Sequence, residues 1–394
     1  MAYIFGTKSQ SVLNEILFET TTTWACNFTC RAIVTVIGAG GGGGAARHDN
    51  AGGAVASAGG GAGGVAKSLL TLTSGTSYVA TIGGAGSYNG TSGNGEATGG
   101  TGGDSSWKVS GGSALLTGNG GTGGPGSGSG GSGGNTPSVT GGAGGAASGG
   151  NIFNATGGEG GDAQIANYDG NGFHIAAGGG GAPGIFGKGH RGGDAACTTG
   201  GYNKVSCAGG AGVWGEGGDA TTTNGNGIEV AGVGGSIWGK GHSFSEAADK
   251  NPFLLTLPNM YNYNFRFRGF YPIGQHTSYL TDAAHTMQGQ TKSIFDGLTG
   301  SGGRRTIQGN YAYSGPGAGG TGAFGSGAYS NAHNLPGLFG GGGADAVFVG
   351  SGSSYGGAGS LGAGGGGVAV YSNSNPYSGK GGGGLVVVSI LEYL

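Results

Sequence analysis

Short hydrophobic runs stand near the two ends of the chain, and each is joined to a run of glycines. Residues 33–37 read Ile-Val-Thr-Val-Ile and lead into the glycine-rich residues 38–44, while the glycines at 381–384 lead into the apolar residues 385–390. β-Branched runs of this length, bounded by glycine, are typical of strands. We therefore expect the two runs to be neighbours in one small sheet. Four valines are expected in its core: Val34, Val36, Val386 and Val388.

Two more stretches have the loose alternation of a strand. Residues 65–72 and 77–82 are separated by a Ser-Gly-Thr turn at 74–76. Two strand patterns separated by a short glycine-containing turn predict a β-hairpin. Residues 105–109 and 113–117 predict two shorter strands.

The first 25 residues differ in composition from the glycine-rich body. Val12, Leu13, Ile16 and Leu17 recur at the spacing of a helix, and a strand through residues 16–18 is the alternative. We expect residues 1–25 to be a terminal arm that serves attachment or assembly and carries no chemistry.

Glycine makes up 109 of the 394 residues, whereas its usual share is about 7%. Between residues 118 and 181 pairs of glycines recur with a three-residue beat. Polyproline II has three residues per turn and no internal hydrogen bonds, so glycine on two of its three faces lets such helices pack and bond backbone to backbone. The irregular glycine positions and the nine prolines exclude collagen. We expect a hexagonally packed polyproline II bundle, with a flexible linker as the alternative.

These patterns together predict an all-β fold with little or no α-helix. The expected framework is a small β-sandwich from which long glycine-rich loops form the polyproline II bundle. After the arm, the segments are the framework with its hairpin (26–117), the bundle (118–242), an aromatic-rich insertion (243–313) and a glycine-rich return with the closing strand (314–394).

The aromatic-rich insertion holds the densest group of aromatic residues in the chain, and arginines alternate with them. Exposed aromatic rings bind sugars and form protein hot spots, and guanidinium groups bind acidic sugars or phosphate. The alternative is that this aromatic face closes the core. The candidate receptor contacts are Tyr261, Tyr263, Phe265, Arg266, Phe267, Arg268 and Tyr271.

The four cysteines form two close pairs, Cys26 with Cys30 and Cys197 with Cys207. Each pair is a candidate disulfide, and whether it is oxidised depends on the compartment. Neither pair has the spacing of a zinc site.

Several function classes are excluded by composition and context. The net charge of −2 argues against nucleic acid, and no apolar run reaches the roughly 18 residues of a membrane span. Residues 38–43 match G-x-G-x-x-G, but no helix pattern follows and residues 58–61 hold no acid for a ribose. We expect no catalytic residue, metal site or cofactor, and hence no enzyme. The first ten residues lack the pattern of a secretory signal, which favours release by host lysis.

The strand at 33–37 with its glycines, the 69–82 hairpin, Trp24 and the closing residues 381–388 resemble the glycine-rich domain of bacteriophage tail and tail-fibre proteins. The beat at 118–181 is similar to the polyproline II bundle of phage tail-fibre tip adhesins. Residues 25–28 depart from the family, because Ala-Cys-Asn-Phe stands where a proline–glycine pair is usual. The aromatic-rich insertion is a second departure.

This resemblance implies a virion protein that binds a host surface glycan or outer-membrane protein through loops at the end of the bundle. It also implies contact with other virion proteins through the N-terminal arm, and homo-oligomers are compatible with it. A self-assembling extracellular fibre or sheath subunit is the alternative, and an ice-binding protein is a remote one.

Overall fold

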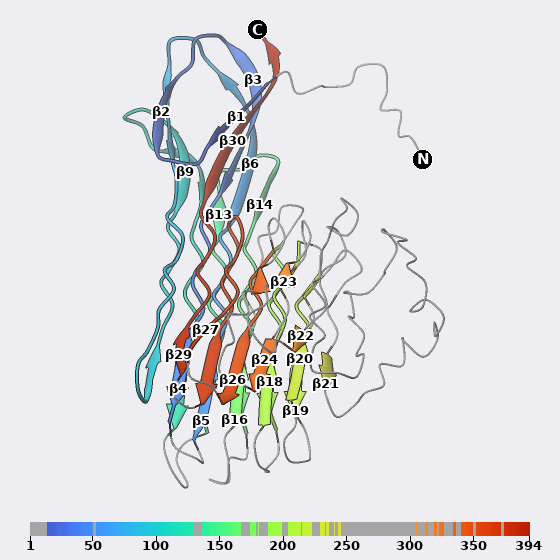
Figure 1. The fold of residues 1–394 in the computed structure, drawn as a ribbon. Helices are drawn as coiled ribbons and strands as arrows, with labels where there is room; N and C mark the ends of the chain where they lie inside the picture. The colour runs from blue at the N-terminus through green and yellow to red at the C-terminus, as the bar shows by residue number, and fades with distance from the viewer. Residues whose placement is uncertain are drawn as a thin grey trace, which may run out of the picture.

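The computed structural model describes residues 14–49, 53–129, 136–166, 174–178, 180, 188–198, 204–213, 215–222, 229–232, 234–235, 240, 243–245, 304–305, 312–313, 319–320, 323–326, 334–335, 340–349, 352–371 and 374–394. Within these residues every regular element is a strand and no helix occurs. The fold class is therefore all-β, as predicted. Strands gather at the two ends of an elongated molecule, and glycine-rich segments run between them (Figure 1).

Two five-stranded sheets form the end of the molecule that holds the C-terminus, and we call them the proximal body. The first sheet has the order β1 (Asn14–Phe18), β30 (Leu385–Tyr393), β3 (Cys30–Ile37), β6 (Val65–Leu72) and β14 (Phe153–Ala155). The second has the order β13 (Ala147–Ser148), β10 (Ala114–Gly118), β9 (Ser105–Val109), β7 (Ser77–Thr81) and β2 (Thr22–Ala25). Residues of both sheets share one core, in which the rings of Trp107 and Tyr78 stack with centroids 5.3 Å apart.

The two framing strands are neighbours, as predicted. β3 and β30 pair antiparallel, with Val34 opposite Val388 and Val36 opposite Val386. All four valines are fully buried in the core of the proximal body. Each contributes about 1.5–3 kcal/mol through burial, so the pairing of β3 with β30 stabilises this body.

The predicted hairpin between residues 65–72 and 77–82 does not form. β6 lies between β3 and β14 in the first sheet, whereas β7 lies between β2 and β9 in the second. The chain crosses at Gly75, whose φ of 80° suits glycine, and the Gly75 N–H bonds the Cys26 carbonyl at 2.7 Å. Crossing between the sheets lets Leu72 and Tyr78 pack in the same core. The alternation of apolar and polar residues along two strands does not by itself distinguish this arrangement from a hairpin.

Residues 14–25 are part of the proximal body. Residues 14–18 form the edge strand β1 and not a helix, and residues 22–25 form β2 at the edge of the second sheet. Their pairing with β30 and β7 buries Phe18 in the shared core. Residues 1–13 of the expected arm lie outside the described residues.

The glycine-rich segments between the two ends bond one another with a period of three residues. In residues 38–44, the N–H groups of 38, 41 and 44 bond residues 58–64, those of 39 and 42 bond residues 100–103, and those of 40 and 43 bond residues 379–382. One segment therefore donates to three neighbours in turn, which a strand with its two-residue alternation does not do. A Cβ atom at Gly41 would collide with the carbonyl group of Thr122. Glycine is what permits this close approach.

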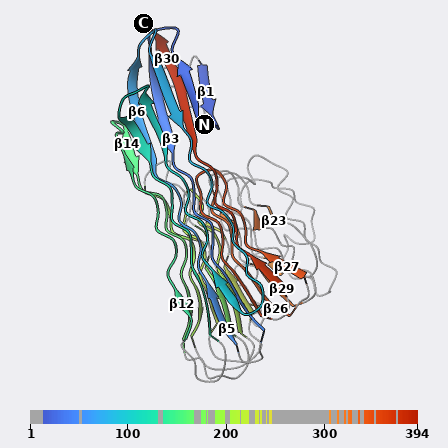
Figure 2. The ribbon, with the colours of Figure 1, turned by 90° about the vertical axis from the view of Figure 1, so that its left-hand side faces the viewer.

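The far end of the molecule is a stack of sheets that we call the distal stack (Figure 2). Its first layer, the ladder sheet, has the order β12 (Ser138–Val139), β15 (Ala163–Ile165), β17 (Ala195–Cys197) and β19 (Ala220–Thr222). The second has the order β11 (Gly126–Ser129), β5 (Ala54–Ser57), β16 (His174–Ala177), β18 (Lys204–Cys207), β20 (Glu229–Gly232) and β21 (Ser243–Ser245). The third has the order β22 (Arg304–Arg305), β24 (Ala323–Ser326), β26 (Asp345–Val349), β28 (Val368–Tyr371), β4 (Ala45–His48) and β8 (Gly95–Ala97).

Two strand pairs complete the sheets. β27 (Gly352–Tyr355) pairs with β29 (Ser374–Tyr377), and this pair contacts the third layer through β26, β28 and β4. β23 (Ala312–Tyr313) pairs with β25 (Asn334–Leu335). Small residues fill the spaces between the layers, chiefly alanine with valine and cysteine. Their size allows the sheets to pack closely.

Candidate functional site on the ladder sheet

The residues predicted to contact a receptor lie outside the described residues. They are Tyr261, Tyr263, Phe265, Arg266, Phe267, Arg268 and Tyr271. Their role stays a prediction.

The four cysteines are buried. Cys26 and Cys30 lie together in the core of the proximal body, where burial and the neighbouring Cys26 thiol raise the pKa of Cys30 to about 11. Cys197 packs between the first and second layers of the distal stack, with its Sγ 3.7 Å from Ser206 Oγ. Cys207 directly follows Ser206 on β18. Its side chain therefore points to the opposite face of that sheet and packs in the core between the second and third layers. The structure thus places Cys197 and Cys207 in separate cores.

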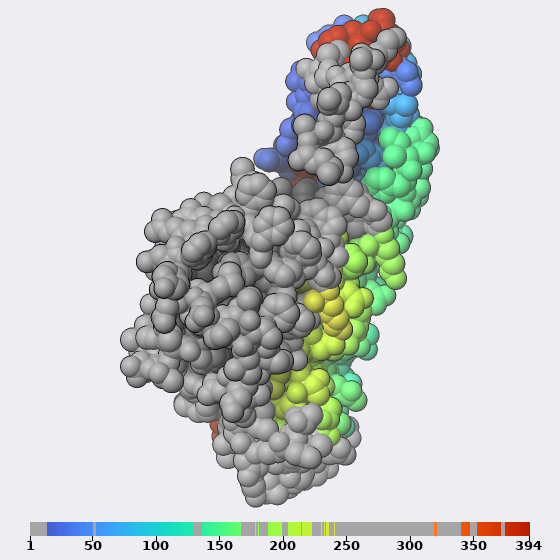
Figure 3. All heavy atoms as spheres, turned by 90° about the vertical axis from the view of Figure 1, so that its right-hand side faces the viewer, coloured from blue at the N-terminus to red at the C-terminus, as the bar shows by residue number. Residues whose placement is uncertain are grey.

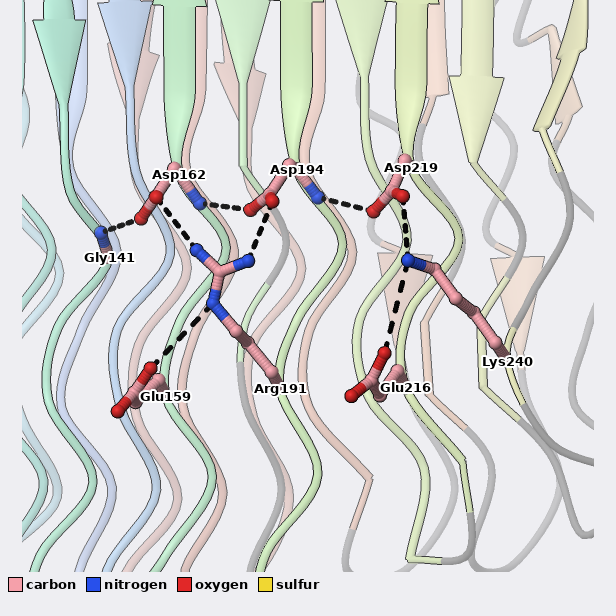
Figure 4. A network of polar contacts seen from close by, with 8 residues as sticks. All are labelled: Gly141, Glu159, Asp162, Arg191, Asp194, Glu216, Asp219 and Lys240. Atoms are coloured by element: carbon pink, nitrogen blue, oxygen red, sulfur yellow. Dashed lines mark hydrogen bonds and ion pairs between the residues drawn. The ribbon is translucent and has the colours of Figure 1, made fainter.

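Three aspartates stand in a row where glycine-rich segments enter the ladder sheet. Asp162, Asp194 and Asp219 directly precede β15, β17 and β19, and these strands are parallel and in register. The same position on neighbouring parallel strands brings the three carboxylates side by side (Figure 4). Their side chains are 40–43% exposed, so the row lies at the surface.

Each carboxylate of this row accepts a backbone N–H from the neighbouring segment. The N–H of Gly141 bonds Asp162 Oδ1 at 2.7 Å, that of Asp162 bonds Asp194 Oδ1 at 2.8 Å, and that of Asp194 bonds Asp219 Oδ1 at 3.0 Å. Hydrogen bonds to a charged acceptor are roughly twice as strong as neutral ones. The row therefore joins four segments at the point where the three-residue bonding pattern of the glycine-rich segments gives way to that of the sheet.

A second row lies three residues earlier in the same segments and is formed by Glu159, Arg191 and Glu216. The Arg191 guanidinium lies 2.6 Å from Asp194, 2.8 Å from Asp162 and 3.7 Å from Glu159. Burial lowers the pKa of Arg191, but the hydrogen bonds and charges of Asp194 and Asp162 outweigh it and raise this pKa above its usual value. One cation thus neutralises carboxylates of two neighbouring segments.

Lys240 continues this pattern at the next segment. Its Nζ lies 2.6 Å from Asp219 Oδ2 and 3.9 Å from Glu216 Oε2. With Lys240 added, the second row alternates in charge from segment to segment, in the order Glu159, Arg191, Glu216 and Lys240. Exposed pairs of this kind contribute about 0.2–1 kcal/mol each, so their alternation serves chiefly to set which segments are neighbours.

The arrangement is suited to assembly of the fold. The carboxylates are occupied by backbone N–H groups and cations, and in the part of the chain that the structure describes no group of three or more His, Cys, Asp or Glu residues is arranged to hold a metal ion. Asp104, directly before β9, accepts the Gly120 N–H at 2.8 Å in the same way. The sequence signal is Gly-Gly-Asp directly before a short strand, at 102–104, 160–162, 192–194 and 217–219. Sequence reasoning missed it because glycine-rich chain produces many short matches.

Asp345 is the first residue of β26, so it also stands where a glycine-rich segment enters a sheet, but its environment differs. Its side chain is fully buried, and neither carboxyl oxygen has a hydrogen-bond partner of good geometry among the described residues. Burial raises the pKa of Asp345 well above its usual value, although the backbone amides of Ala346 and Tyr355 lower it in part. This environment favours the protonated, neutral carboxyl group.

In the residues that the structure describes, no helix is long and apolar enough to cross a membrane. No protein-family model matches the chain, and no curated protein matches it either.

Proposed function

We propose that this chain is a virion structural protein, a tail-fibre or tail-tip adhesin that binds the surface of the host cell. The observation that carries the proposal is that the first and last described strands lie at one end of the molecule, whereas the distal stack lies at the other. β1 and β30 pair in the proximal body, while strands such as β4, β5, β16 and β18 lie in the distal stack at the opposite end (Figure 1). This polarity suits attachment to a virion at one end and contact with a host at the other.

We infer that the proximal body is the β-sandwich framework and that the glycine-rich segments between the two ends are a polyproline II bundle. The three-residue period of the hydrogen bonds and the lack of space for side chains support this inference. Such a bundle bonds its backbone groups internally and is a rigid rod. It would hold the distal stack away from the particle. In Figure 3 the blue and red proximal surface lies at one end, and the yellow-green surface of residues near 190–240 extends from below it toward the other end.

In this proposal the proximal body faces other virion proteins, and the distal end faces a host glycan or outer-membrane protein. The ladder sheet fixes the order of its neighbouring segments in the distal stack. A fibre or sheath subunit is the competing function, and it would assemble with copies of itself without any cell.

Binding of the fluorescently labelled full-length chain to a panel of bacterial strains tests the proposal. We expect saturable labelling of the surface of a subset of strains by dispersed protein. The test variant replaces residues 167–173, which connect β15 to β16, and 199–203, which connect β17 to β18, by glycine–serine sequences of equal length. That variant is expected to melt at the same temperature and to label the cells less. Filaments in electron micrographs, together with no labelling of any strain, would favour the fibre subunit.

A further inference from the structure

The outermost layer beyond the third sheet consists of three neighbouring segments. β27 pairs in parallel with β29, and residues 88–90 run along the other side of β29. Gly90 forms a bridge with Tyr377, while the Ser378 N–H bonds the Asn89 carbonyl at 3.1 Å and the Asn89 N–H bonds Ser378 Oγ at 3.0 Å. The layer is therefore held by backbone and side-chain bonds on both edges of β29.

Each of these three segments contributes one tyrosine to a row. Tyr355 and Tyr377 are paired in register, and their rings stack with centroids 5.1 Å apart and planes at 15°. The ring of Tyr88 meets that of Tyr377 edge to face, with centroids 6.2 Å apart and planes at 72°. Tyr88 is 55% exposed, whereas Tyr355 and Tyr377 are half-buried. The stacked pair thus supports a third ring that is open to solvent.

The alternation of the strands separates this row from the interior. Ser354 and Pro376, the residues before Tyr355 and Tyr377, are buried, so they occupy the face toward the third layer. The tyrosines occupy the opposite face and are not part of the apolar clusters between the layers. Sealing the core therefore does not account for the most exposed ring, Tyr88.

A polar group stands beside the row in a fixed position. Asn375 is exposed and lies two residues before Tyr377 on β29, and its Oδ1 accepts at 2.9 Å from Nη1 of Arg47, a residue of β4 in the third layer. Arg47 is itself only 8% exposed, and its Nε is held by Asp49 at 2.7 Å. This bond fixes the amide of Asn375, and with no partner for Nδ2 among the described residues, Nδ2 can donate to a ligand.

We propose that this row is a carbohydrate platform, in which the ring of Tyr88 packs against a pyranose ring of a host-surface glycan. The C–H face of a sugar is apolar and packs on aromatic rings, while its hydroxyls need hydrogen-bond partners beside the ring. Tyr88 supplies the ring, Tyr377 and Tyr355 hold it in place, and Asn375 Nδ2 donates to a hydroxyl oxygen. The inference rests on the proposed function and names the chemical class of the receptor.

The test measures binding of the full-length chain to an array of purified bacterial surface polysaccharides. We expect the wild-type chain to bind at least one of them, Tyr88→Ala to weaken that binding by about tenfold or more, and Tyr88→Phe to keep it within about twofold, since one aromatic anchor is commonly a hot spot. Asn375→Ala should weaken binding by a smaller factor. Tyr393→Ala is the matched control, because Tyr393 is 53% exposed and also makes an edge-to-face contact, with Phe28, but lies in the proximal body. It should bind as the wild type does.

The outcomes separate this inference from the proposed function. Equal binding by wild type and Tyr88→Ala, at equal melting temperatures, would overturn the platform, as would a wild-type chain that binds no polysaccharide of the array. Labelling of intact cells that is lost after protease treatment of those cells would also overturn the platform, since it points to a protein receptor, yet it would keep the adhesin. If the wild-type chain binds a polysaccharide, Tyr88→Ala weakens that binding and no strain is labelled, the platform stands and the proposed function falls.

Discussion

The carboxylate of Asp194 accepts the backbone N–H of Asp162 from the neighbouring segment at 2.8 Å. The backbone N–H of Asp194 in turn donates to the carboxylate of Asp219, the next aspartate of the row. A side chain here completes the backbone bonding of its neighbour, which explains how glycine-rich segments without apolar side chains acquire a defined order.

Asp194→Ala should therefore lower the free energy of unfolding by about 1–3 kcal/mol, because the Asp162 N–H loses its acceptor and Arg191 loses its nearest carboxylate. Asp194→Asn keeps an acceptor and should have a smaller effect. Urea unfolding measures both, with Gln164→Ala, an exposed polar residue of the same sheet, as the control. An effect of Asp194→Ala no larger than that of the control would contradict the structural role of the row.

Gly144→Val should destabilise the chain by more than about 3 kcal/mol. A Cβ atom at Gly144 would collide with the carbonyl group of Gly157 in the neighbouring segment. Ala143→Ser changes the adjacent, exposed residue and should lie within about 0.5 kcal/mol of the wild type. Thermal unfolding of both variants compares a position without space for a side chain with an exposed position of the same segment. Similar melting temperatures for the two would argue against close packing of the segments.

Asp345 should make stability fall as the pH rises. Its folded-state pKa is raised well above its usual value, whereas the unfolded chain has the ordinary pKa near 3.9. A raised folded pKa contributes stability that is present in full below the unfolded pKa and is lost as the pH rises toward the folded pKa, at up to about 1.4 kcal/mol per pH unit.

Asp345→Asn cannot ionise, so it should remove this part of the pH dependence. Melting temperatures of the variant and the wild type, measured from acidic to alkaline pH, should diverge in favour of the variant as the pH rises. Parallel curves would mean that the Asp345 carboxyl is not held neutral by its burial.

Deletion of residues 385–394 should abolish folding. β30 lies between β1 and β3, and it contributes Val386, Val388 and Ile390 to the core of the proximal body. These residues contribute about 1.5–3 kcal/mol each, while a whole domain is stable by about 5–15 kcal/mol. Far-ultraviolet circular dichroism and size-exclusion chromatography report the outcome. A soluble, shortened chain with an unchanged melting temperature would contradict the central place of β30.

The parts of the fold that sequence predicted are those with apolar side chains. The β-branched runs of β3 and β30 predicted both the strands and their pairing. The partner of β6 was not predictable in this way, because the alternation that fits a hairpin also fits two strands facing one core. Strands such as β15 and β17 are only three residues long and rich in alanine, so they carry almost no hydrophobic pattern.

The aspartate row escaped sequence reasoning for a different reason. A Gly-Gly-Asp triplet has no meaning until parallel strands bring several copies side by side. The same holds for the row of Tyr88, Tyr355 and Tyr377. Tyr88 is far in sequence from the other two, and the three rings meet only through the pairing of their segments. Only the aromatic-rich insertion was dense enough to be singled out, and it lies outside the described residues.

The orientation of the bound protein on a cell tests the central claim most directly. Full-length chain carrying a gold particle at its C-terminus, beside β30 in the proximal body, is to be imaged by electron tomography on a strain that it labels. The proposal predicts that the gold stands away from the cell surface, at the outer end of an elongated molecule whose distal stack touches the cell. Gold lying directly on the surface, with the distal stack pointing outward, would contradict it.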